Sequence, residues 1–150
     1  MAPRLNLSEI FEQSESDAID WRGRTVRAVV RLPVSDGTTV RLRRLDSSRE
    51  RAQALKLGLN AGVLEVNGRG AQSLAIWSHT APLDVELVVR GRRASSIDLW
   101  NAWSLDGVEN SWLGNSGIVV QDHAGGHTLQ CSDGIGEAEF SDLIVWVGVE

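Results

Sequence analysis

Tryptophan and carboxamide side chains are concentrated in one segment of the chain, SIDLWNAWSLDGVENSWLGNSG, residues 96–117. The segment contains Trp100, Trp103 and Trp112 of the six tryptophans in the chain. An exposed indole beside carboxylate and amide groups offers an apolar plate with hydrogen-bond partners, a combination that suits the ring and hydroxyls of a sugar. The sequence therefore raises two alternatives for this segment, a ligand platform or the core of a β-domain.

Strand periodicity separates the tryptophans, because successive side chains of a β-strand point to opposite faces. If residues 96–103 form a strand, one face holds Ile97, Leu99, Asn101 and Trp103, and the other holds Asp98 and Trp100. The aliphatic face is expected to be buried, which leaves Trp100 toward solvent or a partner. We therefore expect the ligand contacts to come from Trp100, Asp98, Asn101 and Asn115. The alternative is that Trp103 and Trp112 fill the core, while a neighbouring chain or an N-terminal helix covers Trp100.

Three groups near Gly125 could ligate a metal. His123 and His127 bracket Gly125-Gly126 and can face one another across a hairpin, with Asp122 adjacent. Imidazole and carboxylate groups of this kind hold Zn²⁺ or non-haem iron, as in jelly rolls of the cupin type. Histidines at a hairpin tip are more often solvated turn residues, so the three are metal candidates and no more.

Acidic loops suggest Ca²⁺ as a second candidate ion, since that cation takes six to eight oxygen ligands at flexible geometry. The spacing does not match an EF-hand loop, and solvated acidic loops are the simpler interpretation. The residues concerned are Asp106, Glu109 and Asn110 in one loop and Asp133, Glu137, Glu139 and Asp142 in another.

No motif identifies a reaction. Cys131 could pair with His127 or His123 for nucleophilic catalysis, but its surroundings in the sequence favour a packed residue at a strand end. No paired carboxylates or phosphate-binding glycine loop stand in a context that defines an active site. We assign no catalytic residues, and an enzyme is the less favoured class.

The net charge of −5 conceals an uneven distribution. All 15 basic residues lie in residues 1–93, which carry +4, whereas residues 94–150 carry −9. Residues 25–32 and 38–45 alternate with period two around Asp36-Gly37, which predicts a hairpin with Arg27, Arg31, Arg41 and Arg43 on one face. The acidic last part is the favoured partner for these arginines, within one subunit or between subunits. Solvated arginines are the next alternative, and nucleic acid is the least favoured partner, because the arginines lack interleaved aromatic residues.

The remaining pattern predicts an all-β chain. Asn6 and Glu9 form a capping-box signature for a helix from about Leu7 to Ser14, within an N-terminal helical segment of residues 1–20. Short apolar runs separated by turn signals then follow to the end of the chain, where residues 143–149 are apolar on both faces. We expect one domain over residues 1–150, an antiparallel, jelly-roll-like β-sandwich.

Composition narrows the function classes. The single cysteine and the lack of an export signal or apolar spanning segment predict a cytoplasmic protein that does not enter a membrane. The favoured hypothesis is a non-catalytic ligand-binding β-sandwich, with a carbohydrate or other small molecule stacked on an exposed tryptophan. The alternatives are a homo-oligomeric structural or assembly protein and a cupin-like metal-dependent enzyme.

Overall fold

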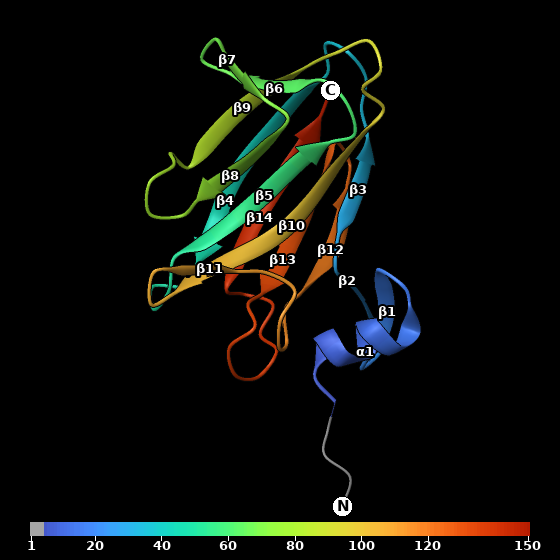
Figure 1. Cartoon of the computed structure of the whole chain (residues 1–150), viewed down its shortest axis with the longest axis vertical. Helices are drawn as coiled ribbons and strands as arrows, with labels where there is room; N and C mark the ends of the chain where they lie inside the picture. Colours follow the sequence, from blue (N-terminus) through green and yellow to red (C-terminus); the bar gives the residue numbers. More distant parts are fainter. Residues whose placement is uncertain (1–4) are drawn as a thin grey trace, which may run out of the picture.

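Two antiparallel sheets pack face to face in the computed structural model, which describes residues 5–150 (Figure 1). The larger sheet has nine strands, in the spatial order β1 (Ala18–Trp21), β2 (Arg24–Arg27), β12 (Gly117–His123), β13 (Gly126–Ser132), β14 (Leu143–Val149), β4 (Thr39–Ser47), β9 (Asp84–Arg90), β6 (Val63–Val66) and β7 (Arg69–Ala71). The smaller sheet runs β11 (Val108–Asn110), β10 (Ser96–Leu105), β5 (Gln53–Leu59) and β8 (Ser73–Trp77), and β3 (Val30–Pro33) pairs with β10. The prediction of an all-β sandwich with a short N-terminal helix is confirmed.

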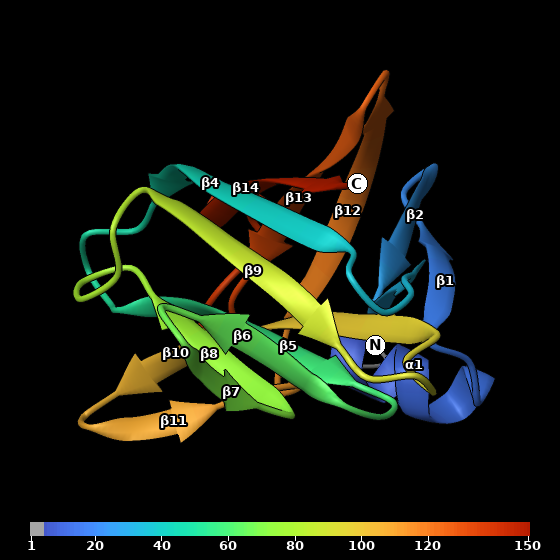
Figure 2. The same cartoon turned by 90° about the horizontal axis from the view of Figure 1, so that it is seen from above.

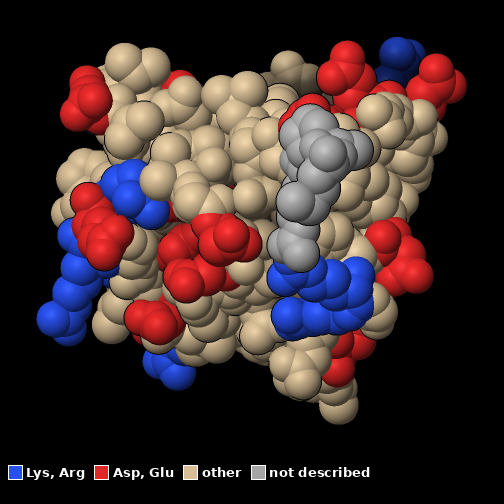
Figure 3. All heavy atoms as spheres, turned by 90° about the horizontal axis from the view of Figure 1, so that it is seen from below, with Lys and Arg blue, Asp and Glu red and all other residues tan. Residues whose placement is uncertain are grey.

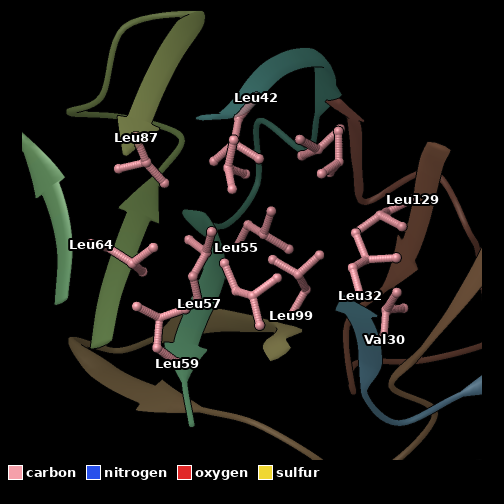
Figure 4. Packing of buried hydrophobic residues seen from close by; sticks show 14 of the residues in the cluster. Val30, Leu32, Leu42, Leu55, Leu57, Leu59, Leu64, Leu87, Leu99 and Leu129 are labelled. Atoms are coloured by element: carbon pink, nitrogen blue, oxygen red, sulfur yellow. The ribbon is translucent and has the colours of Figure 1, made fainter. Parts of the chain in front are cut away.

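The core lies between the sheets. Alternate residues of the central strands point inward, so that leucines of β4, β5, β9, β10 and β13 meet in one layer (Figure 4). Trp103 joins this interior with only 1 % of its surface exposed, as strand parity predicts. The fully buried members of the cluster include Leu57, Leu87, Leu99 and Leu129.

A second, smaller apolar cluster forms under the helix α1 (Leu7–Ser14), which lies beside β1 at the lower right of Figure 1. Leu7 of the helix packs there with Ile19, Val26 and Val119. The helix begins where the capping box predicts, because the Asn6 side chain accepts from the backbone N–H of Glu9 at 2.9 Å. Within the described residues no helix is long and apolar enough to cross a membrane.

The predicted arginine hairpin is wrong. The chain changes sheets at Ala28-Val29: Arg27 pairs with Ile118 in the larger sheet, whereas Arg31 pairs with Asp98 in the smaller one. The turn at Asp36-Gly37 therefore joins two sheets and not two neighbouring strands. Period two continues across the break because both short strands bury the same parity of residues, each in its own apolar cluster.

Candidate ligand-binding sites

Trp112 covers the ring of Trp100 on the outer face of the smaller sheet. The two indoles stack with their centroids 5.3 Å apart and their planes at 22°. On the sheet side, the Trp100 ring lies over Gly58, where an added Cβ would sit 3.6 Å from Cζ3. Trp112 is itself 48 % exposed, and its Nε1–H donates to the carbonyl of Ala28 at 3.0 Å. Trp100 therefore presents less free surface than strand parity suggests.

Charged groups beside Trp100 are already paired. Asp98 accepts two bonds from Arg31, from Nε at 2.7 Å and from Nη2 at 3.3 Å. Lys56 Nζ lies 6.0 Å from the Trp100 centroid and donates to Glu109 Oε2 at 2.7 Å. A ligand at this face would meet the outer sides of two ion pairs.

The two predicted asparagines lie elsewhere. Asn101 is 3 % exposed and points between the sheets, where its Nδ2 donates to the Ser132 carbonyl at 2.9 Å. Asn115 accepts from the backbone N–H of Leu7 at 3.1 Å and donates to the Gly136 carbonyl at 2.8 Å. Of the four predicted ligand-binding residues, the structure brings only Trp100 and Asp98 to one surface.

The hairpin histidines lie on opposite faces of the larger sheet. The register pairs Asp122 with His127 and His123 with Gly126, so neighbouring pairs point in opposite directions. His127 Nδ1 lies 2.7 Å from Asp122 Oδ1, and His123 Nε2 lies 2.8 Å from Thr128 Oγ1. The two imidazoles do not face one another.

The acidic loop after β13 is organised around a buried carboxylate. Asp133 is fully buried and its Oδ2 accepts from Arg51 Nε and from Gln53 Nε2, both at 2.9 Å. Asp142 accepts from the backbone N–H of Asp133 at 2.9 Å, and burial raises the pKa of Asp142 to about 6. Within residues 5–150 no three His, Cys, Asp or Glu side chains are arranged to hold a metal ion.

Cys131 lies fully buried in the main core. Burial raises the pKa of its thiol well above the usual range, and the nearby carboxylate of Asp142 adds to the effect. The thiolate form that a nucleophile needs is therefore disfavoured.

Sequence reasoning missed a groove on the outer face of the larger sheet. It has a volume of about 570 Å³, and the partly exposed indole of Trp146 lines it together with side chains of β4 and β9. Two glycines leave room for the indole to lie against the sheet. A Cβ at Gly126 would lie 2.8 Å from Trp146 Cε2, and a Cβ at Gly148 would collide with the ring. The ring therefore lies flat, with small residues beneath it.

Ion pairs form the polar side of this groove. Arg43 donates to both oxygens of Asp84, from Nε at 2.8 Å and from Nη2 at 3.3 Å. Arg41 lies 3.5 Å from Glu86 and 3.3 Å from Glu150. These ion pairs hold guanidinium and carboxylate groups in place beside the Trp146 indole. Their remaining donors and acceptors face outward. We call the region lined by Trp146, Arg41, Arg43, Asp84 and Glu86 the Trp146 groove.

One sequence signal does point to the Trp146 groove. The run LIVWVGV of β14 is apolar on both faces, which predicts a strand covered on both faces. In the structure the inner face is buried, but Ile144 and Trp146 on the outer face stay partly exposed.

Comparisons with protein-family models, with curated proteins and with solved structures find no match for this chain.

Proposed function

We propose that the protein is a non-catalytic, carbohydrate-binding β-sandwich and that its ligand occupies the Trp146 groove. The observation that carries the proposal is the indole of Trp146, seated flat on Gly126 and Gly148 beside the Arg43–Asp84 and Arg41–Glu86 pairs. A sugar ring has an apolar face for the indole and hydroxyls at its edge for charged groups, so both halves of the groove find a partner.

The size and charge of the groove support a neutral sugar. Its volume of about 570 Å³ lies within the range of small-molecule sites, roughly 300 to 1,000 Å³. Arg41 and Arg43 face the three carboxylates of Asp84, Glu86 and Glu150, so no guanidinium is left over for an acidic sugar. Hydroxyls both donate and accept, which lets them bond to the free sides of these pairs.

The experiment is a titration of the chain with a panel of neutral and acidic oligosaccharides, followed by calorimetry on the best ligand. Trp146→Ala is expected to weaken binding at least tenfold, because stacking on the indole is lost. Trp100→Ala is the matched control, since it removes an equal ring from the opposite sheet, and it should leave affinity unchanged. Loss of binding in Trp100→Ala alone would move the site to the smaller sheet. Absence of binding across the panel would overturn the proposal.

Gly148→Ala offers a subtler variant, because the three atoms nearest to the added Cβ all belong to the Trp146 ring. It should lift the indole from the sheet and weaken sugar binding while all polar groups of the groove remain. Circular dichroism and the melting temperature establish that the fold persists. Unchanged affinity in this folded variant would contradict the role given to the flat ring.

A second candidate function, self-association, is favoured by apolar side chains at the end of the molecule where β10 turns into β11. Leu105 and Val108 are 42 % and 61 % exposed there and lie opposite one another in the β10–β11 register, so their side chains form one exposed apolar patch. Light scattering at several protein concentrations tests this function. A constant monomer mass would contradict self-association. A dimer that dissociates in the Val108→Glu variant would support it.

A further inference from the structure

The larger sheet extends beyond the smaller one at β2 and β12. Figure 2 shows the β12–β13 hairpin projecting past the other strands, with β1 and β2 beside it. The inner face of β12 consequently leaves the packed core at Val120 and continues as Asp122. A groove of about 390 Å³ forms here, between this overhang and β3.

The floor of this groove is apolar. Val30 and Leu32 of β3 and Val120 of β12 line it, and all three also contact the main core. The rim is polar, with Thr25 and Arg27 from β2, Arg31 from β3, Asp122 from β12 and His127 from β13. Polar groups therefore make up the larger part of the lining, and the apolar side chains lie at the bottom.

One positive charge on the rim has no ion-pair partner within the described residues. Arg31 is held by Asp98 at 2.7 Å, and Asp122 Oδ1 lies 2.7 Å from His127 Nδ1, a hydrogen bond between the two side chains. Among the ion pairs formed by residues 5–150, Arg27 takes part in none. Its guanidinium is therefore free to bind an oxyanion through paired N–H donors.

We propose that this groove binds a small monocarboxylate with a short apolar chain. The carboxylate accepts hydrogen bonds from Arg27, and the chain lies on Val30 and Val120. A single unpaired guanidinium matches one negative charge, which favours a carboxylate over a phosphate dianion. The apolar floor gives the chain a surface to cover. This site is separate from the Trp146 groove, and its test uses different ligands.

The test is an NMR titration of the full chain with hexanoate, acetate, hexanol and inorganic phosphate. Hexanoate is expected to shift the backbone signals of Thr25 and Val120 and the ring signals of His127. Acetate should bind at least tenfold more weakly, because it lacks the methylenes that cover the floor. Hexanol or phosphate binding as tightly as hexanoate would overturn the proposal, as would the absence of any shift up to tens of millimolar, a limit of roughly −2 to −3 kcal/mol in binding free energy.

Arg27→Gln supplies the second arm, and it should weaken hexanoate binding about tenfold or more by removing a charge-assisted bond. The control is Arg69→Gln, which removes the same charge from β7 at the opposite end of the nine-stranded sheet. Both side chains lie on exposed residues, so both variants should keep the wild-type pattern of dispersed signals. Equal loss of affinity in the two variants would show general charge attraction and contradict the site.

Discussion

Asp142 is a carboxyl group that the fold makes harder to ionise. Desolvation raises its pKa to about 6, and this effect outweighs the stabilising bond from the backbone N–H of Asp133. The neighbouring carboxylates of Asp133 and Glu139 act in the same direction as burial, while Arg51 acts against it. The folded protein therefore holds the Asp142 proton more tightly than the unfolded chain does.

This difference predicts how stability depends on pH. The contribution of the Asp142 proton to the free energy of unfolding is fully present below the ordinary pKa of 3.8. It is lost as the pH rises through about 6, the pKa in the folded protein. Asp142→Asn keeps an acceptor for the Asp133 N–H but has no charge to bury. We expect its melting temperature to exceed that of the wild type by a few degrees at pH 7.5 and to match it near pH 3.5.

Thermal unfolding followed by circular dichroism at both pH values measures the effect. Glu137→Gln, in the same loop, is a suitable control because it removes a charge from an exposed side chain. A stability gain of equal size at both pH values would mean that the charge of Asp142 is not the cause.

At the residue scale, the sequence predicts which face a side chain points to better than it predicts which residues that side chain contacts. Strand parity places Trp103 inward and Trp100 outward, because alternation along one strand needs no knowledge of its neighbours. Parity cannot show that Trp112, which has a positive φ of 56°, folds back onto Trp100, or that Asn101 bonds to Ser132 on the other sheet. Those contacts depend on residues that meet only after the sheets have packed.

At the scale of elements, α1 depends on a distant loop. The Asn115 side chain accepts a hydrogen bond from the backbone N–H of Leu7, and the Gly114 carbonyl accepts one from the N–H of Ser8 at 2.9 Å. Free N–H groups in the first turn of a helix need partners outside the helix, and this loop provides two of them. The same loop meets residues 133–137, since a Cβ at Gly114 would collide with the Gly134 carbonyl.

Asn115→Ala should therefore destabilise the protein without affecting sugar binding. The loss of two side-chain hydrogen bonds predicts a cost of about 1 to 3 kcal/mol in the free energy of unfolding. Urea denaturation and calorimetry with the best sugar measure the two effects. Weaker sugar binding with unchanged stability would restore Asn115 to the ligand-binding residues.

Elements were predicted well where the signal is local. The capping box locates α1, and Ala124-Gly125 forms the turn of the predicted hairpin between β12 and β13. The strand that contains Val26 and Leu32 was predicted as one piece, because its two halves share a parity although they belong to different sheets. The alternating pattern does not reveal where the chain changes sheets, because the inward residues of β2 and β3 enter two clusters that are both apolar.

At the scale of the whole molecule, the basic first part of the chain pairs with the acidic last part. Within residues 5–150, four ion pairs join residues up to 93 to residues 94–150, namely Arg31–Asp98, Arg41–Glu150, Arg51–Asp133 and Lys56–Glu109. Seen from below, the described residues form small separate groups of acidic and basic side chains, with no continuous basic surface on that side (Figure 3). The fold thus brings part of the basic first section against the acidic last section, and the net charge of −5 remains.

Among these pairs, Arg51–Asp133 should matter most for stability. Asp133 is fully buried and Arg51 is 18 % exposed, whereas the other three pairs lie near solvent. Arg51→Met leaves a buried carboxylate without its counter-charge, which predicts a loss of about 3 kcal/mol in the free energy of unfolding at pH 7. Arg41→Met should cost much less, because solvent screens an exposed pair. Equal costs in urea denaturation would contradict this ranking.

The ends of the two sheets determine how copies of the chain can meet. The larger sheet ends in β1 and β7, with four and three residues, and the smaller sheet ends in β11 with three residues and β8 with five. A short terminal strand offers few unpaired backbone groups to a second chain, which opposes growth by strand addition. Strand addition is therefore least favoured at β1, β7 and β11, and β8, the longest of the four end strands, offers a second chain the most backbone groups.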